Sequence, residues 1–472
     1  MRRTKILATI GPASEEAEVL RAMIQAGLNC VRCNFSHGSH EDHQKRIELV
    51  RRVAAEEGKI VGILADLQGP KIRVSRFKNK SIELKNGAKF YLDATFDKEN
   101  GDETQVGIDY KELPNDVASG DILLLDDGKV ILKVLKTNGK RVETEVVEGG
   151  KLSNNKGINK MGGGLTAPAL TDKDKEDIRF LAKLNVDYVA VSFPRGPEDM
   201  LEARALLNQV NCHAGLIAKI ERTEATHNII EIIETSEGVM VARGDLAVEI
   251  GEEYVPSMQK KIIQHARTLD KIVITATQMM ESMIESPTPT RAEVSDVVNA
   301  ILDGTDTVML SAETAAGKYP VKVIKEMNKI CSAAEQDPIT RISKHRVECH
   351  FNRIDEAIAM SAMYAANHMD VKAIIAMTES GSTPLWMSRI RSSLPIYALT
   401  PNTATMGRMS LCLGVEPIAF SSTDYKPEHV NTAAIDLLIK RKLIHRGDLV
   451  LLTCGDHIGL HGGTNQIKIL KA

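Results

Sequence analysis

A lysine and a carboxylate lie two residues apart at the end of one apolar run of the chain. Residues 216–220 have the composition of a buried strand, yet they include Lys219, and Glu221 follows directly. Side chains at positions i and i+2 of a strand point to the same side, so Lys219 and Glu221 share one face of the strand end. A Lys and a Glu so placed most often form only a salt bridge, and the pair by itself does not establish a reaction.

A second carboxylate follows the next apolar run, which ends in Arg243, Gly244 and Asp245. If the two runs form neighbouring strands, Glu221 and Asp245 reach one cation, and two carboxylates with water and substrate oxygens are a common way to hold Mg²⁺. The backbone N–H groups of Gly244 and Asp245 can face an anion. Lys219 beside that metal would be a point charge for a transferring phosphoryl group.

Polar side chains accompany other apolar runs in the same way. A guanidinium beside amide and hydroxyl oxygens suits an anion and a small cation together, and a threonine hydroxyl can touch a carboxylate or relay a proton. In the second run and directly after it, these residues are Arg32, Asn34, Ser36 and His37. At the end of the third run they are Asp66, Lys71 and Arg73, and at the end of the seventh run the residue is Thr277.

Eight short apolar runs alternate with amphipathic helical patterns. The runs are apolar almost throughout, as strands buried on both faces are, and eight such units predict an α/β fold of the (β/α)8 TIM-barrel type. The C-terminal strand ends hold the chemistry in that fold, so the polar residues would meet at one mouth. The alternative is that polar residues merely mark where strands stop, but eight ends rich in charges and hydroxyls favour a site. The helix signals are Ser14 as an N-cap with Gly27 as the stop, and starts at Thr171, Pro256 and Pro320.

The segment between the third and fourth apolar runs of the barrel has a different residue pattern. Residues 71–166 carry short β-rich runs and the hairpin signals Asp127-Gly128 and Asn138-Gly139. We expect an inserted small β-barrel domain that acts as a lid. The barrel then comprises residues 1–70 and 167–340. After a polar linker, residues 355–472 have the pattern of a C-terminal three-layer α/β domain.

The composition narrows the class of protein. Of 472 residues, 43% are hydrophobic and 26% are charged, and a net charge of −3 argues against nucleic-acid binding by charge. The N-terminal apolar run is too short for a signal sequence, and no stretch has the length of a membrane span. Seven scattered cysteines are expected to be reduced thiols, so we expect a cytoplasmic protein without a membrane or nucleic-acid partner.

Three short motifs do not indicate sites. Cys30 and Cys33 stand at i and i+3 of a strand and face opposite sides, so they cannot share a zinc ion. The stretch AETAAGKY lacks the first glycine of a phosphate-binding loop. The RGD at Arg243 follows a buried strand and is not expected to be an adhesion signal.

Long segments of the chain resemble bacterial pyruvate kinases. They include TKILATIGPAS, VRCNFSHGS, LADLQGPKIR, GLIAKIERTEA, MVARGDLAVEIG and the tail GGTNQIKIL, and the resemblance covers essentially the whole chain. It implies a barrel with a β lid and a C-terminal regulatory domain. It further implies transfer of the phosphoryl group of phosphoenolpyruvate to ADP, giving pyruvate and ATP at the last step of glycolysis. Mg²⁺ (or Mn²⁺) and K⁺ as cofactors, and a homotetramer, are implied as well.

The resemblance also implies roles for individual residues. Lys219 would stabilise the transition state, and Thr277 with a water would protonate the enolpyruvate carbon. The implied sets are Glu221 and Asp245 for the divalent metal; Arg32, Lys219, Thr277 and the backbone of Gly244 and Asp245 for phosphoenolpyruvate; Asn34, His37, Arg73 and Lys156 for the nucleotide; and Asn34, Ser36, Asp66 and the backbone of Leu67 for the monovalent cation.

Three positions depart from the family pattern. Members that need K⁺ carry DTKGPEIR where this chain has DLQGPKIR, so Leu67 replaces a Thr and Lys71 replaces a Glu. The Lys71 ammonium can supply the missing positive charge, and we expect activity without K⁺; the alternative is that Lys71 points to solvent. Ala247 stands where the family usually has Gly, and if that position has φ > 0, Ala costs roughly 1 kcal/mol and would shift the metal loop.

A hydroxyl-rich loop in the C-terminal domain resembles the effector-phosphate loop of the family. Its residues are Thr378, Ser380, Gly381, Ser382 and Thr383. Hydroxyls around a glycine turn can form a phosphate nest, although a simple strand-to-helix cap explains the same residues. Glu379 is acidic where bisphosphate-activated members often carry a basic group, so we expect a sugar monophosphate or AMP as the activator rather than fructose bisphosphate.

Two other functions fit part of the pattern. A metal-dependent aldolase on the same barrel would share the carboxylates but would not need Lys219, the lid or Lys156. A degenerate kinase kept as a metabolite sensor would have lost the residues of the reaction. Four residues of the reaction would be the first to be lost in such a protein, and this chain retains all of them: Lys219, Glu221, Asp245 and Thr277.

Overall fold

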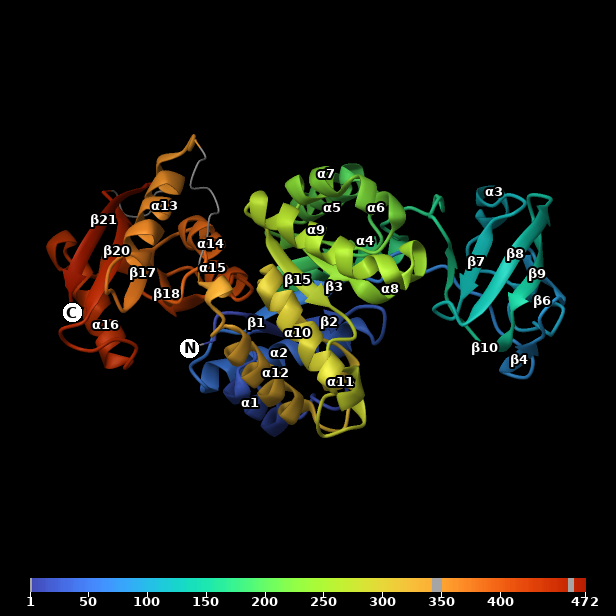
Figure 1. Ribbon diagram of the computed structural model, residues 1–472, viewed down its shortest axis with the longest axis horizontal. Helices are drawn as coiled ribbons and strands as arrows, with labels where there is room; N and C mark the ends of the chain where they lie inside the picture. Colours follow the sequence, from blue (N-terminus) through green and yellow to red (C-terminus); the bar gives the residue numbers. More distant parts are fainter. Residues whose placement is uncertain (1, 342–349, 457–461) are drawn as a thin grey trace.

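The computed structural model describes residues 2–341, 350–456 and 462–472, which form three bodies in a row (Figure 1). The barrel lies in the middle. The insertion extends from one end of it, and the C-terminal body packs against the other. Part of the predicted linker, residues 342–349, lies outside the described residues. Among the described residues, no helix has both the length and the apolar character that a membrane crossing requires.

The eight predicted apolar runs form a closed parallel barrel. Its strand order is β1-β16-β15-β14-β13-β12-β3-β2, which confirms the predicted fold class. The strands are β1 (Lys5–Thr9), β2 (Cys30–Asn34), β3 (Gly62–Asp66), β12 (Tyr188–Val191), β13 (Gly215–Ile220), β14 (Gly238–Ala242), β15 (Ile272–Ala276) and β16 (Thr307–Leu310).

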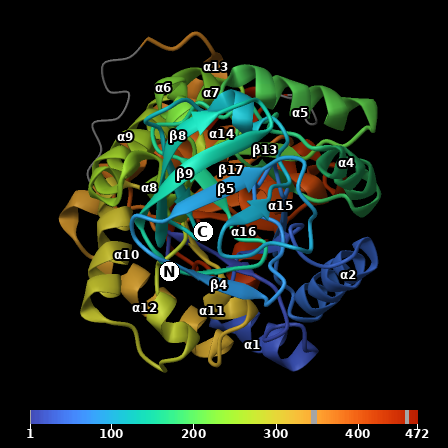
Figure 2. The same cartoon turned by 90° about the vertical axis from the view of Figure 1, so that its right-hand side faces the viewer.

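A ring of helices covers the outside of the barrel, as the view along the long axis of the molecule shows (Figure 2). Their apolar faces pack on the outward-facing strand residues in one continuous core. The helices are α1 (Ala17–Ala26), α2 (His40–Glu56), α4 (Asp172–Leu184), α5 (Pro197–Gln209), α6 (Thr223–His227), α7 (Ile229–Glu234), α8 (Arg243–Ile250), α9 (Val255–Thr268), α10 (Arg291–Asp303), α11 (Ala312–Ala315) and α12 (Pro320–Ala334).

The predicted helix ends are confirmed with one exception. Thr171 caps α4 in a capping box, and Gly27 ends α1 with φ 116°, a left-handed conformation that glycine adopts without a Cβ clash. The prediction of Ser14 as an N-cap was wrong. Glu16 is the N-cap of α1, while the Ser14 hydroxyl exchanges hydrogen bonds with the backbone of Gly11. That serine stabilises the preceding turn instead.

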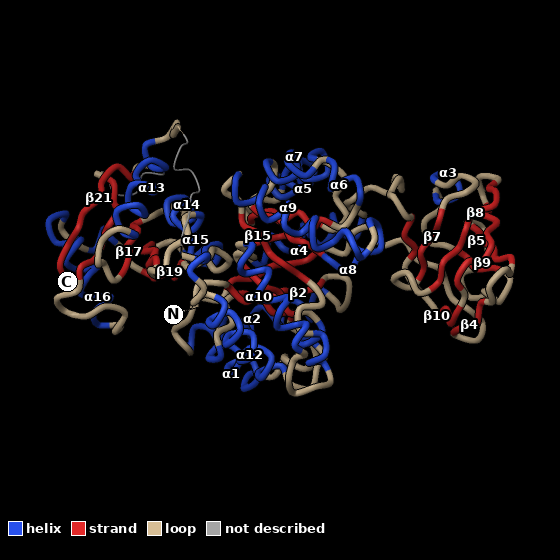
Figure 3. The backbone as a smooth tube through the Cα atoms, viewed as in Figure 1, coloured by secondary structure: helices blue, strands red, loops and turns tan. Residues whose placement is uncertain are grey.

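The insertion is built mainly of strands and loops (Figure 3). It holds a six-stranded sheet in the order β11-β7-β8-β9-β5-β6 and a β10-β4 pair. Both predicted hairpin turns join antiparallel neighbours, β7 to β8 and β8 to β9. The elements are β4 (Ser81–Leu84), β5 (Lys89–Asp93), β6 (Gln105–Gly107), α3 (Leu113–Asp116), β7 (Ile122–Leu125), β8 (Val130–Thr137), β9 (Arg141–Glu148), β10 (Gly150–Ser153) and β11 (Ile158–Lys160).

The C-terminal body is a five-stranded sheet with helices on its faces. The strand order is β19-β18-β17-β20-β21, parallel except for the β20–β21 pair. The elements are α13 (Ile354–Asn367), β17 (Ala373–Met377), α14 (Ser382–Arg389), β18 (Ile396–Thr400), α15 (Thr403–Met409), β19 (Val415–Ala419), α16 (Val430–Lys440), β20 (Leu449–Gly455) and β21 (Thr464–Lys471).

A second core joins the C-terminal body to the interior of the barrel. Cys30 of β2 and Tyr188 of β12 belong to the same buried cluster as Ile374 of β17. Cys33 faces the other way and packs in the core under the barrel helices. The two thiols therefore lie on opposite sides of β2, as the strand period predicts.

Candidate active site

Lys219 lies in a buried ion cluster at the C-terminal ends of the barrel strands. Its Nζ lies 2.9 Å from Oε1 of Glu221 and 3.2 Å from Oδ1 of Asp66, and it donates to Oγ of Ser192 at 2.7 Å. Burial lowers the pKa of Lys219, but the two carboxylates outweigh burial and raise that pKa above its ordinary value. The ammonium therefore stays charged and is held in one place by three partners.

Asp66 connects this cluster to Arg32. The Nε of Arg32 lies 2.6 Å from Oδ2 of Asp66, and its Nη1 donates to Oγ1 of Thr9 at 3.1 Å. Burial by itself would raise the pKa of Asp66, but Lys219 and Arg32 lower it below its ordinary value. A guanidinium fixed at its base in this way can offer its remaining N–H groups to an anion.

Glu221 and Asp245 are the two carboxylates predicted to hold a divalent metal. Glu221 is 1% exposed, and its Oε2 accepts the backbone N–H of Phe193 at 2.8 Å. Burial raises the pKa of Glu221 to about 7; Lys219 opposes this shift and the charge of Asp245 adds to it. A buried carboxylate that feels a second negative charge gains from a cation between the two, so these residues fit a divalent metal.

Protein side chains alone do not complete a metal shell here. Within the described ranges, no cluster of three or more His, Cys, Asp or Glu residues is arranged to hold an ion. Substrate oxygens and water would have to supply the other ligands, which is the usual situation for Mg²⁺ bound together with phosphate.

Lys71 lies beside Asp245 rather than beside Asp66. Its Nζ is 3.7 Å from Oδ1 of Asp245, and its side chain is about a third exposed. The charge of Asp66, in the predicted monovalent-cation set, is balanced by Arg32 and Lys219. In the same set, the carbonyl oxygen of Leu67 accepts the Ser192 hydroxyl at 2.7 Å. The positive charge of Lys71 thus enters the site on its divalent-metal side.

Thr277 projects its hydroxyl toward the start of α8. Its Oγ1 accepts the backbone N–H of Gly244 at 3.1 Å and donates to the carbonyl of Ala276 at 2.7 Å. Thr277 has φ 65°, and a left-handed conformation costs a non-glycine residue on the order of 1–3 kcal/mol. The surrounding structure must stabilise this conformation.

The predicted nucleotide residues are brought together only in part. His37 and Arg73 line one cavity of about 480 Å³ between the barrel and the insertion. Lys156 pairs with Asp126 of the insertion at 2.8 Å, and the side-chain oxygen of Asn34 accepts the backbone N–H of Ser36. Neither Lys156 nor Asn34 lines that cavity.

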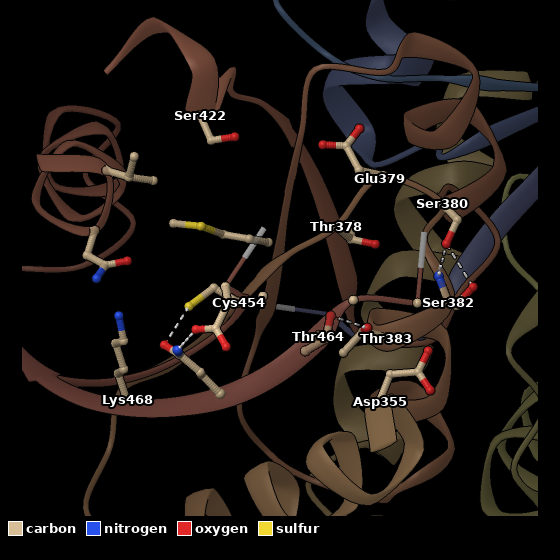
Figure 4. Close-up of a pocket in the computed structure, with 18 of the residues that line it drawn as sticks. Asp355, Thr378, Glu379, Ser380, Ser382, Thr383, Ser422, Cys454, Thr464 and Lys468 are labelled. Carbon is tan, nitrogen blue, oxygen red and sulfur yellow. Dashed lines mark hydrogen bonds between the residues drawn. The ribbon is translucent and has the colours of Figure 1, made fainter. Parts of the chain in front are cut away.

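The hydroxyl-rich loop of the C-terminal body lines a separate cavity of about 230 Å³ (Figure 4). The backbone N–H of Gly381 donates to Thr378, and the hydroxyls of Ser380 and Ser382 lie 2.8 Å apart. Thr383 is tied to Thr464 at 3.0 Å. Among the described residues, the charged side chains on the walls of this cavity are Asp355, Glu379, Asp456 and Lys468. Lys468 is therefore the only basic side chain on the described walls.

Two contacts in the barrel mouth were not predicted. Ser192 links Lys219 to the carbonyl of Leu67; the sequence indicates Ser192 as the polar end of its apolar run, but not these partners. Phe193 offers its backbone N–H to Glu221 from a left-handed conformation, φ 56°. A backbone donor in a phenylalanine leaves no signature in the side-chain pattern.

Ala247 is not strained, contrary to the concern raised by the family pattern. It lies within helix α8 and is absent from the residues with positive φ. Glycine in a helix interior is less favourable than alanine by roughly 1 kcal/mol. We therefore expect Ala247→Gly to lower the free energy of unfolding by up to about 1 kcal/mol and to leave the KM for the substrate unchanged. Urea titration and steady-state kinetics measure the two quantities, and a markedly lower KM would contradict this prediction.

Comparisons with known proteins give one consistent result. Residues 1–324 match the family model described as pyruvate kinase, barrel domain, and residues 356–470 match the model described as pyruvate kinase, alpha/beta domain. The chain is 54% identical to pyruvate kinase II of Salmonella typhimurium over 476 residues, covering 100% of this chain and 98% of that protein. It is 53% identical to the pyruvate kinase of Haemophilus influenzae over 459 residues, 96% of each chain. A crystal structure of a pyruvate kinase from Cryptosporidium parvum superposes with a TM-score of 0.93 at 34% identity, covering 100% of this chain and 96% of that one.

Proposed function

The chain belongs to the pyruvate kinase family and is a phosphotransferase acting between phosphoenolpyruvate and ADP, and we propose that the ion cluster around Lys219 is where the phosphoryl group is transferred. The single observation that supports this most is the ammonium of Lys219, held by Glu221, Asp66 and Ser192 at the barrel mouth. Phosphoryl transfer needs positioned positive charge more than it needs covalent chemistry, and a charged, immobile ammonium supplies it.

The phosphate of phosphoenolpyruvate binds to Arg32, with Asp66 and Thr9 fixing the guanidinium. The backbone of Gly244 and Asp245 binds the substrate together with Thr277, whose Oγ1 accepts the N–H of Gly244. Lys219 stabilises the negative charge on the oxygens of the phosphoryl group as it passes to ADP. The nucleotide is bound by Asn34, His37, Arg73 and Lys156.

Glu221 and Asp245 are the residues that would hold Mg²⁺ or Mn²⁺. When bound, the ion supplies a Lewis acid that offsets the charge of the phosphoryl oxygens. Asn34, Ser36, Asp66 and the carbonyl of Leu67 form the monovalent-cation position of the family, and Lys71 supplies its positive charge from the Asp245 side of the site.

Thr277 takes part in the second half of the reaction. Once the phosphoryl group has left, a proton must be added to the terminal carbon of the enolpyruvate. The hydroxyl of Thr277, with a water behind it, delivers that proton; a C–H bond forms, the carbon–carbon double bond becomes single, and the enol oxygen becomes the keto oxygen of pyruvate.

The experiment that tests this function is pyruvate formation from phosphoenolpyruvate and ADP with MgCl₂ in K⁺-free buffer, followed by addition of KCl. We expect full activity before the addition. In Lys71→Glu the added carboxylate should make activity depend on K⁺ by roughly tenfold or more, which corresponds to about 1.4 kcal/mol. Lys151→Glu, the same reversal at an exposed lid position, is the control and should stay independent of K⁺.

The three other outcomes separate the claims. Wild-type activity that appears only after KCl keeps the kinase and removes the role of Lys71. A Lys71→Glu variant that stays K⁺-independent also contradicts that role. Absence of pyruvate in both buffers would return the aldolase and sensor interpretations.

The cavity at Ser380 and Ser382 is the effector site in this proposal. With Lys468 as the basic side chain on its described walls, it suits a single phosphate better than two, so ribose 5-phosphate or AMP should lower the KM for phosphoenolpyruvate more than fructose 1,6-bisphosphate does. Ser382→Asp should abolish this activation by like-charge repulsion. Ser257→Asp, in the first turn of α9, is the matched control. Equal activation by ribose 5-phosphate and fructose 1,6-bisphosphate would contradict the proposal.

The family also leads us to propose a cytoplasmic homotetramer. The proposed division of the chain is residues 1–70 and 167–340 for the barrel, 71–166 for the lid and 355–472 for the C-terminal domain. Analytical ultracentrifugation tests the tetramer, and a monomer at micromolar concentration would contradict it.

A further inference from the structure

Arg243, which the proposed reaction does not use, is a buried side chain that connects three separate parts of the barrel mouth. It opens α8 directly after strand β14, and it is 7% exposed. Its Nη1 lies 2.6 and 2.8 Å from the two carboxylate oxygens of Asp296 in α10, and its other donors reach the loop after β15. A buried guanidinium is retained where its fixed fork of donors is needed, because a lysine cannot reproduce it.

The loop that Arg243 reaches has an unusual backbone. Thr277 and Gln278 are consecutive non-glycine residues with φ 65° and 51°. Left-handed conformations are uncommon for residues other than glycine and rarest for β-branched ones such as Thr277, so two in succession require support from outside the loop. Nε of Arg243 lies 3.2 Å from the carbonyl oxygens of Ala276 and of Thr277, and its Nη2 lies 2.5 Å from the latter. The guanidinium therefore binds the backbone on both sides of the Thr277 α-carbon.

The same arrangement fixes the Thr277 side chain against α8. Gly244 follows Arg243 in the chain, and its backbone N–H donates to Oγ1 of Thr277 at 3.1 Å. Adjacent residues thus hold Thr277 at two points, the Arg243 side chain at its carbonyl and the Gly244 backbone at its hydroxyl. The direction of the Thr277 hydroxyl is set by these bonds and by the backbone angle they maintain.

We propose that Arg243 is the positioning residue for Thr277: by binding the carbonyls of Ala276 and Thr277 it maintains the left-handed backbone that aims the Thr277 hydroxyl at the enolpyruvate carbon. The inference rests on the proposed role of Thr277 in proton transfer. Arg243 touches no reacting atom and acts only through Thr277. Its loss misdirects the hydroxyl, and misplacement of a reacting group by about 1 Å can cost about 10²-fold in rate.

The test is a double-mutant cycle read out by the proton step alone. Full-length wild type, Arg243→Met, Thr277→Ala and the double variant are incubated with pyruvate, MgCl₂ and ATP in D₂O. Proton NMR then follows loss of the methyl signal as a C–H bond breaks and a C–D bond forms. We expect Arg243→Met to slow this exchange about 10²-fold and to lower kcat more than it changes the KM for phosphoenolpyruvate. In the Thr277→Ala background Arg243→Met should cause no further loss, since coupled residues are not additive.

Two further variants serve as controls, one for unfolding and one for the loss of an arginine elsewhere in the barrel. Arg243→Lys keeps a positive charge opposite Asp296 with fewer donors, and it should give an intermediate exchange rate; if Arg243→Met does not fold, the cycle is run with Arg243→Lys. Arg204→Met removes a similar arginine, which binds the carbonyl of Ala214 and pairs with Glu237 near the opposite ends of the strands, and it should leave exchange unchanged.

The outcomes are distinguishable. Wild-type exchange in the Arg243 variants, or losses that add in the double variant, would overturn the positioning role while leaving Thr277 in place. Normal exchange in Thr277→Ala would overturn the proposed proton transfer through Thr277, and the inference with it.

Discussion

Replacement of Lys219 by methionine is expected to lower kcat for pyruvate formation about 10³-fold, the loss found when one preorganised charge or donor is removed from a transition state. Methionine keeps the length and apolar stem of lysine but removes the ammonium. The proton step should be affected far less, because its donor, Thr277, comes from a different strand end. Exchange of the pyruvate methyl protons in D₂O should therefore remain measurable in Lys219→Met.

The folded state should tolerate this replacement. Asp66 keeps its pairing with Arg32 at 2.6 Å. Glu221 loses the partner that lowers its pKa, and since burial already places that pKa at about 7, the carboxyl can take up a proton and become neutral. Thermal unfolding should show a protein that is still folded at assay temperature.

The control is Lys175→Met. Lys175 lies on helix α4 and pairs with Glu202 at 3.1 Å, and both side chains are about a third or more exposed. Its loss should leave kcat within a factor of about two, since exposed ion pairs contribute little. An equal loss of phosphoryl transfer and methyl exchange in Lys219→Met would contradict a role specific to the phosphoryl group, and a loss below tenfold would contradict the transition-state role altogether.

The strand period was sufficient to predict the first contact of Lys219. Alternation by two places Lys219 and Glu221 on one side of β13, and their ion pair follows. The barrel rule brought the ends of neighbouring strands together, which explains Asp66 with Arg32. Both arguments use only periodicity and topology, and both hold because the runs are apolar almost throughout and therefore form buried strands.

Contacts that depend on loop geometry could not be predicted in this way. Lys71 follows the Gly69-Pro70 turn, and nothing in the sequence fixes which carboxylate it would meet; the structure places it beside Asp245. The left-handed backbones of Phe193 and Thr277 are likewise set by tertiary contacts. The Ala247 concern failed for a related reason, because a family glycine was taken to mark a positive φ where the chain is helical.

The contact between the barrel and the C-terminal body includes a fully buried ion pair. Arg389, at the end of α14, and Asp306, directly before β16, are both 0% exposed and bind through two oxygens of the carboxylate. Asp306 also accepts the backbone N–H groups of Val273 and Leu413, and Arg389 donates to the carbonyl of Lys271. Because helix α14 begins at the hydroxyl-rich loop, the same helix joins that cavity to the barrel.

Arg389→Met is therefore expected to lower the free energy of unfolding by about 3–5 kcal/mol, because it leaves the charge of Asp306 buried without a cation. Trp386, the only tryptophan of the chain, lies in the same helix, so its fluorescence during urea titration reports the unfolding of this body.

Two comparisons make the measurement specific. Lys372→Met removes an exposed pair with Asp370 and should cost at most about 1 kcal/mol. Arg389→Met combined with Asp306→Asn removes both charges and keeps a side-chain oxygen that can accept a backbone N–H, as Asp306 does from Val273 and Leu413. It should recover part of the loss, since no unpaired charge stays buried. If Arg389→Met were no more destabilising than Lys372→Met, the buried pair would not be what holds the C-terminal body to the barrel. The apolar core shared by Cys30, Tyr188 and Ile374 would then be the dominant contact.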